Sequence, residues 1–384
     1  MRVVVIGGMG NFGARICQRL GLESGLEIIA TSRRPSSTSG SAKAAALDTD
    51  SPTFAVDLKA LGPDLVIHCA GPFQGQDYRV ALASMACKAH YIDIADGRGF
   101  VTGFVSAVAP AAEAAGRFAI TGASTLPALS SAVVDALKQS LATLRAIHIV
   151  IAPGQHAPRG IATVAAVLGY AGEPFLWWRE GEWRTAHGWQ ELQRTRLSFG
   201  TRCAAACDVP DLQLLPARYP GVQTVSFRAA LEISLQHYAL WMMAACRRAG
   251  LALPVARWGG SLNRVATWLN WFGSDTGGMK VRAAGIDAAG QRKCLTWELV
   301  ADGNHGPEIP CMAAVLLANK LHRGHSFAAG AQVCMGMLEL AEFEPEFARW
   351  DIKTQVSESR PCTIILCVRI LSMGSCARRR RSWR

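Results

Sequence analysis

The 384-residue chain lacks several patterns that would define its chemistry directly. Its 12 cysteines include no Cys-x-x-Cys pair, which excludes the usual spacing of a zinc knuckle or a redox dithiol. None of its five tyrosines is followed four residues later by lysine, which excludes a short-chain dehydrogenase. A Gly-x-x-x-x-Gly-Lys-Ser/Thr phosphate loop is absent, and so is any run of about 20 apolar residues. These absences exclude a phosphate-loop nucleotide hydrolase and an integral membrane protein.

Charged residues are scarce, at 18%, whereas 50% of the residues are hydrophobic. This composition provides a large core and, at about 150 residues per domain, predicts two domains. The apolar run Val3–Ile6 is too short for a signal peptide, and the cysteines follow no disulfide framework. We therefore expect a soluble, reduced, cytoplasmic protein.

The first 145 residues alternate short β-rich runs with helical patterns, which predicts a doubly wound parallel sheet of the Rossmann type. The expected strands are Val3–Ile6, Glu27–Thr31, Thr53–Val56, Leu65–Cys69, His90–Ile94 and Phe118–Thr121. The expected helices are Asn11–Leu22, Gln76–Lys88, Val101–Ala115 and Leu129–Leu141.

The character of the sequence changes after residue 145. Tryptophan, absent before Trp177, occurs nine times from there to Trp297. Strand-like and helix-like pieces are mixed here, which predicts an α+β second domain. The expected strands are His148–Ala152, Gln223–Phe227, Met279–Gly285 and Lys293–Val300; the expected helices are Ile161–Gly172, Leu235–Ala249, Pro310–His322 and Ala328–Ala341.

A Gly-x-Gly-x-x-Gly motif follows the first expected strand and opens the first expected helix. In a dinucleotide site, Gly8 would allow the tight turn, Gly10 the approach of a pyrophosphate, and Gly13 close helix–strand packing. An ordinary glycine turn is the alternative. The motif predicts that cofactor binding involves Gly8, Gly10, Asn11, Phe12 and Gly13.

The end of the second expected strand indicates which dinucleotide is bound. NAD sites usually place an acidic residue there, but Glu27–Thr31 continues into Ser32, Arg33 and Arg34. A hydroxyl and two guanidinium groups suit a 2′-phosphate through charge-assisted hydrogen bonds. We therefore expect NADP in preference to NAD; the alternative is that both arginines are simply solvated.

Together with four later pieces, this motif resembles the saccharopine dehydrogenase-like family. The pieces are Ala70-Gly71-Pro72-Phe73, His90-Tyr91-Ile92-Asp93, Gly122-Ala123-Ser124-Thr125-Leu126-Pro127 and His305-Gly306-Pro307-Glu308-Ile309-Pro310, and the likeness spans residues 1–345. The resemblance implies an NAD(P)-dependent oxidoreductase with a Rossmann domain and an inserted second domain. It also implies that Ala70, Gly71, Pro72 and Phe73 lie along the nicotinamide half of the cofactor.

This reading divides the chain into four parts. Residues 1–145 would form the NADP-binding domain, 146–306 an α+β substrate or dimerisation domain, and 307–345 C-terminal helices that return to the first domain. Residues 346–384 would be a divergent basic tail without ordered structure. The net charge of +11 is concentrated there, because 353–384 holds 8 of the 40 basic residues and a single acid, Glu358. A solvated tail is expected rather than a nucleic-acid-binding module.

Three residues at strand ends are candidates for acid–base chemistry. Asp93 and Asp96 follow the fifth expected strand, where a carboxylate could bind a substrate ammonium or act as a base; a helix cap or turn acid is the alternative. Cys69 could assist proton transfer or serve as a small buried apolar residue. Relatives that act on saccharopine tend to have an aromatic residue at the position of Asp96, which disfavours saccharopine itself as the substrate. His305 is a further possible proton donor, and we expect no metal site.

Two functions fit the sequence. The first is an NADP-dependent oxidoreductase that transfers hydride to or from an imine or amino acid, a carbonyl or an enoyl substrate. The second is a non-catalytic NADP-binding sensor or scaffold, because no residue is an unambiguous acid–base group. The expected partners are a small-molecule substrate and a second copy of the chain, through the second domain.

Overall fold

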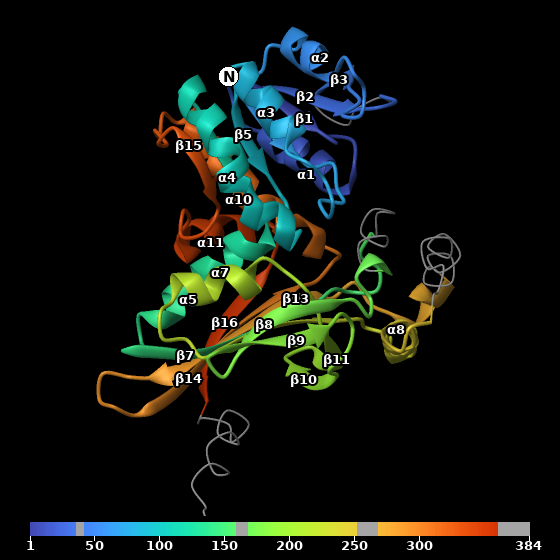
Figure 1. Cartoon of the computed structure of the whole chain (residues 1–384), viewed down its shortest axis with the longest axis vertical. Helices are drawn as coiled ribbons and strands as arrows, with labels where there is room; N and C mark the ends of the chain where they lie inside the picture. Colours follow the sequence, from blue (N-terminus) through green and yellow to red (C-terminus); the bar gives the residue numbers. More distant parts are fainter. Residues whose placement is uncertain (36–41, 159–167, 252–267, 360–384) are drawn as a thin grey trace, which may run out of the picture.

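The computed structural model of the chain describes residues 1–35, 42–158, 168–251 and 268–359. Two seven-stranded sheets, sheet A and sheet B, form its two lobes. Figure 1 shows sheet A at the top and sheet B at the bottom, with helices α5 (Ser130–Lys138), α7 (Asp211–Arg218) and α11 (Leu340–Arg349) between them.

Sheet A is entirely parallel, in the order β15-β6-β5-β4-β1-β2-β3. Residues such as Val4 of β1 and Val66 of β4 are fully buried, because helices cover both faces. The expected Rossmann-type doubly wound sheet is confirmed. Its strands are β1 (Arg2–Ile6), β2 (Glu27–Ser32), β3 (Lys43–Ala46), β4 (Leu65–His68), β5 (His90–Asp93), β6 (Phe118–Thr121) and β15 (Gly330–Val333).

Most expected elements of this lobe are present with shifted ends. Its helices are α1 (Asn11–Leu20), α2 (Phe54–Ala60), α3 (Arg79–Ala86), α4 (Arg98–Ala115), α5 and α10 (Ile309–His322), with the short segments η1 (Thr125–Leu129) and η3 (Gly306–Glu308).

Two predictions in this lobe are wrong. Thr53–Val56 is not a strand: Phe54 and Leu58 lie buried on one face of α2, and the Thr53 hydroxyl donates to Asp57 at 2.7 Å at the helix start. The third strand is β3 instead. Ala328–Ala341 is not a helix either, because Gly330 and Gly336 have φ of +126° and +68° and residues 330–333 pair with β6.

Sheet B is mixed, in the order β10-β11-β12-β7-β13-β14-β16, and only the β12–β7 pair is parallel. Its strands are β7 (Thr143–Ala152), β10 (Gln193–Leu197), β11 (Gly200–Ala206), β12 (Thr224–Ala230), β13 (Gly277–Ile286), β14 (Arg292–Ala301) and β16 (Lys353–Ser359). A separate hairpin, β8 (Pro174–Arg179) with β9 (Glu182–His187), and helices α8 (Ser234–Arg248) and η2 (Leu269–Phe272) complete this lobe. The expected α+β arrangement is confirmed; most of the helix expected over Ile161–Gly172 lies outside the described residues.

The expectation of an unordered tail from residue 346 is wrong for its first part. Residues 346–349 finish α11, and β16 pairs antiparallel with β14 from Lys353 to Ser359. Trp297 and Phe347 have ring centroids 6.4 Å apart, so apolar packing holds α11 against sheet B. The remainder of the expected tail lies outside the described residues.

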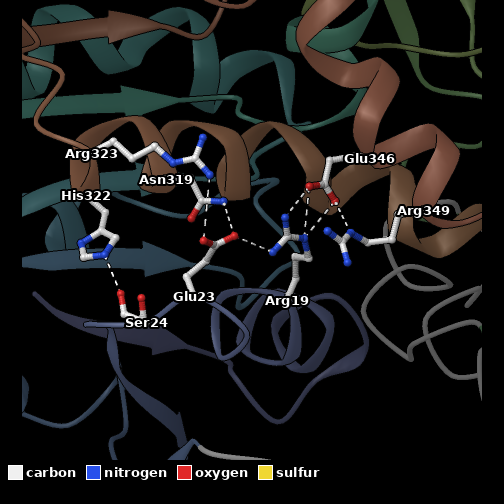
Figure 2. A network of polar contacts seen from close by, with 8 residues as sticks. All are labelled: Arg19, Glu23, Ser24, Asn319, His322, Arg323, Glu346 and Arg349. Carbon is white, nitrogen blue, oxygen red and sulfur yellow. Dashed lines mark hydrogen bonds and ion pairs between the residues drawn. The ribbon is translucent and has the colours of Figure 1, made fainter.

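The C-terminal helices are joined to α1 by a polar network (Figure 2). The Arg19 guanidinium donates to both carboxylate oxygens of Glu346 on α11, at 2.7–3.1 Å, and to Glu23 at 2.9 Å. Asn319 of α10 also donates to Glu23, at 3.4 Å. Because Arg19 and Glu346 are both buried, this pairing fixes the end of the chain to the first lobe. In the part of the chain described here, no helix is long and apolar enough to cross a membrane.

Candidate functional site

The glycine-rich loop lies between the carboxyl end of β1 and the start of α1. The left-handed residue is Gly7, with φ of +75°, and the Gly10 amide donates to the Gly7 carbonyl at 2.9 Å. A Cβ on Gly8 would come within 2.8 Å of Ala30 Cα, and one on Gly13 would collide with the Gly7 carbonyl. The turn is therefore made at Gly7, whereas Gly8 and Gly13 allow the sheet, loop and helix to pack closely.

The first turn of α1 is open to an anion. Gly10 is its N-cap residue, no side chain caps the first amides, and the turn contains no acidic residue. Free amides and the positive end of the helix dipole favour a phosphate at this position. Asn11 and Phe12 occupy this turn. The side-chain amide of Asn11 donates to the Pro158 carbonyl of the other lobe at 3.3 Å.

The residues expected to select the dinucleotide follow β2, the strand beside β1. Ser32 ends β2 and donates to Met9 Sδ at 3.3 Å, which places its hydroxyl against the glycine-rich loop. Arg33 and Arg34 are exposed, and within the described residues neither forms an ion pair. The chain therefore places a hydroxyl against the loop and continues into two exposed guanidinium groups that have no ion-pair partner among the described residues.

The segment Ala70–Phe73 follows β4, on the other side of β1. A Cβ on Gly7 would lie within 3.1 Å of Ala70, so the segment packs directly on the glycine-rich loop. Gln76 holds its turn by donating to the carbonyls of Ala70 and Pro72, at 2.9 and 2.7 Å. Phe73 is buried against His68 and Phe100, whereas Gly71 and Pro72 are exposed.

Asp93 is held by the protein itself. Its Oδ1 accepts hydrogen bonds from the amides of Ala95 and Gly122 and from the Thr121 hydroxyl, at 2.8–2.9 Å. The side chain is fully buried, and burial raises the pKa of Asp93 to about 6 despite these donors. This carboxyl ties the end of β5 to the end of β6, which fits a positioning group better than a substrate ligand.

Asp96 and Cys69 have more access to solvent. Asp96 is exposed, yet partial desolvation by neighbouring protein raises the pKa of its carboxyl, and a hydrogen bond with Gln74 opposes that shift. Tyr170 of the second lobe lies nearby. Its pKa is raised by burial first, then by the charge of Cys207 and then by the charge of Asp96. Burial raises the pKa of the half-exposed Cys69 thiol, so this thiol stays protonated at neutral pH.

A contact between the lobes beside Asp96 was not expected from the sequence. Arg98, at the start of α4, donates to Asp208 at 2.9 Å and to the Leu176 carbonyl at 2.6 Å. Burial raises the pKa of Asp208, and the hydrogen bond from Arg98 opposes that shift. Because Asp208 lies more than 100 residues from Arg98, no local pattern could identify this pair.

The late motif that begins at His305 contacts α1 and the end of α11. His305 Nδ1 pairs with the Trp350 carbonyl at 2.7 Å, and Glu308 forms an ion pair with Arg15 of α1. The ion pair of Glu308 ties the motif to α1. The ring of His305 is engaged by its hydrogen bond to the backbone of Trp350. Among the described residues, no three histidine, cysteine or acidic side chains lie close enough together to hold a metal ion.

Comparison with known proteins supports the fold. No protein-family model matches the sequence, and a comparison with curated proteins finds no match. Among solved structures, the L-Glu-forming saccharopine dehydrogenase of Saccharomyces cerevisiae superposes with a TM-score of 0.64 at 10% identity, over 94% of this chain and 100% of that chain. The homospermidine synthase of Legionella pneumophila, solved with NAD, gives a TM-score of 0.56 at 11% identity, over 93% of this chain and 91% of that chain.

Both similar structures extend over the two lobes and not over the dinucleotide-binding half alone. The likeness expected from the glycine-rich loop and the four later sequence pieces is thus confirmed at the level of the whole fold. The chain has the two-lobed fold of these two solved structures.

Proposed function

We propose that the protein is an NADP-dependent oxidoreductase of the saccharopine dehydrogenase-like type. The observation that carries this proposal is the combination of an uncapped α1 N-terminus with Ser32, Arg33 and Arg34 at the adjacent strand end. The first suits a pyrophosphate and the second a 2′-phosphate. The two similar structures, one of them a dehydrogenase and the other solved with NAD, support a nicotinamide cofactor.

Different segments of the chain would have different roles in such an enzyme. Amides of the loop Gly8–Gly13 would hold the pyrophosphate, and Ala70–Phe73 would line the nicotinamide half. The nicotinamide supplies or accepts the hydride when the cofactor is bound. Asp96 would bind the substrate or exchange a proton with it, because it is accessible and its pKa is raised. Asp93 would position the β5 and β6 ends, and protonated Cys69 would be a donor at the same edge.

The substrate we propose is an imine or amino acid, a carbonyl or an enoyl compound. Asp96 favours a substrate with a basic or ammonium nitrogen, because a carboxylate attracts such a group. This carboxylate also weighs against saccharopine itself, since the family members that use it tend to have an aromatic residue there.

A non-catalytic NADP-binding sensor or scaffold is a second candidate. Two observations favour it: Oδ1 of the buried Asp93 is engaged by three internal hydrogen bonds, and the Cys69 thiol is not activated. Turnover separates the two candidates. Steady NADPH oxidation with members of an imine and carbonyl panel, reduced at least about tenfold in kcat by Asp96→Asn, would support the enzyme. Tight NADPH binding without turnover across the panel would support the sensor.

Cofactor choice is tested by replacing both arginines after β2 with glutamine. Because a hydrogen bond to a charged group contributes about 1.5–3 kcal/mol, Arg33→Gln/Arg34→Gln should raise the Kd for NADPH by at least about tenfold. The Kd for NADH should stay the same, as should both constants in the control Arg145→Gln, an exposed arginine on β7. Equal affinity of the unmodified protein for NADH and NADPH would contradict the proposal.

The four-part division of the chain and association of two copies through the second lobe are also retained as proposals. The sheet A strand β15 and the α10–α1 packing are compatible with a returning segment after residue 306. Light scattering coupled to size exclusion would measure the mass of the particle: twice the chain mass supports a dimer, and the chain mass contradicts it.

A further inference from the structure

One face of sheet B carries a cluster of polar and basic side chains. Side chains alternate between the two faces of a strand. On β7, Ile147 and Ile149 belong to the main core, which includes α5, whereas Val150 and Ala152 pack in a separate small cluster. His148 therefore points to the face of Val150, away from the core that joins the two lobes.

The strand register brings three further residues to this face. Ser226 of β12 lies directly opposite His148 on one side, and Arg282 of β13 lies opposite it on the other. Arg228 is two residues beyond Ser226 and donates to the Ser226 hydroxyl at 3.2 Å. We call His148, Ser226, Arg228 and Arg282 the basic cluster; Ser226 is buried and the other three are half-buried.

The two guanidinium groups of the basic cluster have no carboxylate partner. Within the described residues neither Arg228 nor Arg282 forms an ion pair, and Nε of Arg228 is buried without an acceptor. The hydrogen bond of Arg282 goes to Cys294 Sγ at 3.5 Å, and sulfur is a weak acceptor. Burial lowers the pKa of Arg228, and the charge of the nearby Glu191 opposes this shift. The ion pair of Glu191, however, is formed with Arg179, at 3.6 Å.

The other charged groups nearby do not compensate the cluster. Lys280 lies next to Arg282 on the same face of β13 and pairs with Glu298 at 3.2 Å. Arg228 also stacks over the Trp177 ring, 5.4 Å from its centroid, which supports its side chain but does not neutralise its charge. Half-buried cations without a counter-ion are costly, so an anion at this face would be strongly stabilised.

His148 adds a third donor. The Ser226 hydroxyl lies 2.7 Å from His148 Nδ1 and accepts a hydrogen bond from Arg228, which leaves its own proton available for donation to Nδ1. Burial and the two arginines lower the pKa of His148 to about 4, so the ring is neutral at pH 7. With Nδ1 as the acceptor, the remaining ring proton resides on Nε2.

We propose that the basic cluster binds a small oxyanion of the phosphate type. Its oxygens would accept hydrogen bonds from Arg228, Arg282 and Nε2–H of His148, which together provide two forked cations and one neutral donor. The site lies on the second lobe, on the face that points away from the core shared with α5, and it is separate from the glycine-rich loop. It therefore adds a ligand to the proposed function and does not depend on it.

The experiment is a calorimetric titration of the full-length protein with inorganic phosphate, at constant ionic strength set with sodium chloride. Because the cofactor site can also take phosphate, the titration uses protein saturated with NADPH and, in parallel, the Arg33→Gln/Arg34→Gln variant. We expect one phosphate per chain in the NADPH-saturated protein. In the variant, whose α1 N-terminus can still take an anion, we expect one bound phosphate that is lost when Arg282→Gln is added. If NADPH fails to bind, the proposed function fails, and the second titration still tests the basic cluster.

Arg282→Gln should weaken phosphate binding at least tenfold. Arg145→Gln is the matched control, because Arg145 is an exposed arginine of the same strand, three residues from His148, at the bulge where β7 loses register with β13. Ser226→Ala, a small change, should weaken binding several-fold and release His148 from the Nε2–H tautomer, which imidazole nitrogen NMR measures directly.

Three results would overturn the proposal. The first is the absence of phosphate binding in both titrations. The second is equal affinity in Arg282→Gln and Arg145→Gln, which would indicate a non-specific ion only. The third is a dimer that dissociates in Arg282→Gln while free phosphate shows no binding, since a carboxylate of a second copy would then be the natural counter-ion.

Discussion

Helix α1 has two halves that serve the protein in different ways. Its first turn faces the glycine-rich loop, and the glycines that shape that turn lie within a few positions along the chain. The following turns carry Arg15 and Arg19, whose partners Glu308 and Glu346 lie about 300 residues away. One helix therefore combines a binding end built from neighbours with a supporting face built from the far end of the chain.

The difference shows what each half should be sensitive to. The first turn depends on empty space, because Gly13 permits the helix to approach the Gly7 carbonyl. The second half depends on charge, because Arg19 is buried and needs the Glu346 carboxylate. Substitutions in the two halves should consequently separate cofactor affinity from stability.

The largest effect is expected for Gly13→Ala. The added methyl group collides with the backbone of Gly7, so the loop and the helix must move apart. A shift of about 1 Å at a binding loop is enough to cost about 100-fold, and we expect the Kd for NADPH to rise by at least that factor. Fluorescence titration with NADPH measures it. An unchanged Kd would show that the loop does not hold the cofactor.

The next effect is expected for Glu346→Gln, which removes the carboxylate that accepts three hydrogen bonds from Arg19 and leaves Glu23 as the remaining charge partner of that guanidinium. The loss of hydrogen bonds to a charged group should lower the free energy of unfolding by about 2 kcal/mol. The Kd for NADPH should change less than about twofold, because the first turn of α1 is intact. Chemical denaturation measures the stability. Glu344→Gln, an exposed glutamate on the same helix, is the control, and a loss as large as that of Glu346→Gln would contradict the role of the pair.

A third prediction concerns the pH dependence of stability. This dependence should arise more from the contact between α5 and α7 than from either half of α1. Asp211 is fully buried there, accepts a hydrogen bond from Ser130, and has a second oxygen without a partner. Burial raises the pKa of Asp211 from 3.8 to about 7. The folded protein thus holds this proton more tightly than the unfolded chain, and stability should fall as pH rises between these values, by up to about 1.4 kcal/mol per pH unit.

Asp211→Asn should lower that slope, as measured by denaturation at pH 5, 6, 7 and 8. The change should be clearest between pH 6 and 7, because Asp93, with its pKa raised to about 6, adds a slope of the same sign below that range. Ser130→Ala keeps the carboxyl and should therefore keep the slope. If the slope of the unmodified protein persists in Asp211→Asn, a different group is responsible for it.

The smallest effect is expected for Gly99→Ala at the start of α4. A Cβ at this position meets no neighbouring atom within 4 Å, in contrast to Gly13. The methyl group restricts the unfolded chain and should raise the free energy of unfolding by about 0.5 kcal/mol, with NADPH affinity unchanged. A thermal melt that shows destabilisation would mean that α4 uses this glycine after all.

The sequence predicts the parallel sheet better than the mixed one, for a physical reason. Strands such as Leu65–His68 are apolar throughout because helices cover both faces, and each ends in a glycine or polar turn. The strands of sheet B have a less distinctive sequence pattern. Gln193–Leu197, for example, is largely polar, and its position depends on pairing with β11. The failed helix at Ala328–Ala341 has the same cause, since β15 exists through its pairing with β6.

The candidate site divides in the same way. The loop around Gly8–Gly13 and the arginines after β2 are contiguous, so their residue types and spacing identify them. The Arg98–Asp208 pair and the basic cluster around His148 join distant segments, and strand register decides which side chains meet. The sequence alone could list these residues but not bring them together.

The late return of the chain to sheet A has a consequence for folding. Strand β15 and the Glu346 carboxylate must both reach the first lobe before its edge and the second half of α1 are complete. During synthesis, the first six strands of sheet A emerge long before residue 330, so β6 waits as an exposed edge. The lobe that is synthesised first is thus among the last parts to become complete. Because its final contacts join residues far apart in the chain, we expect its folding to finish slowly and after translation.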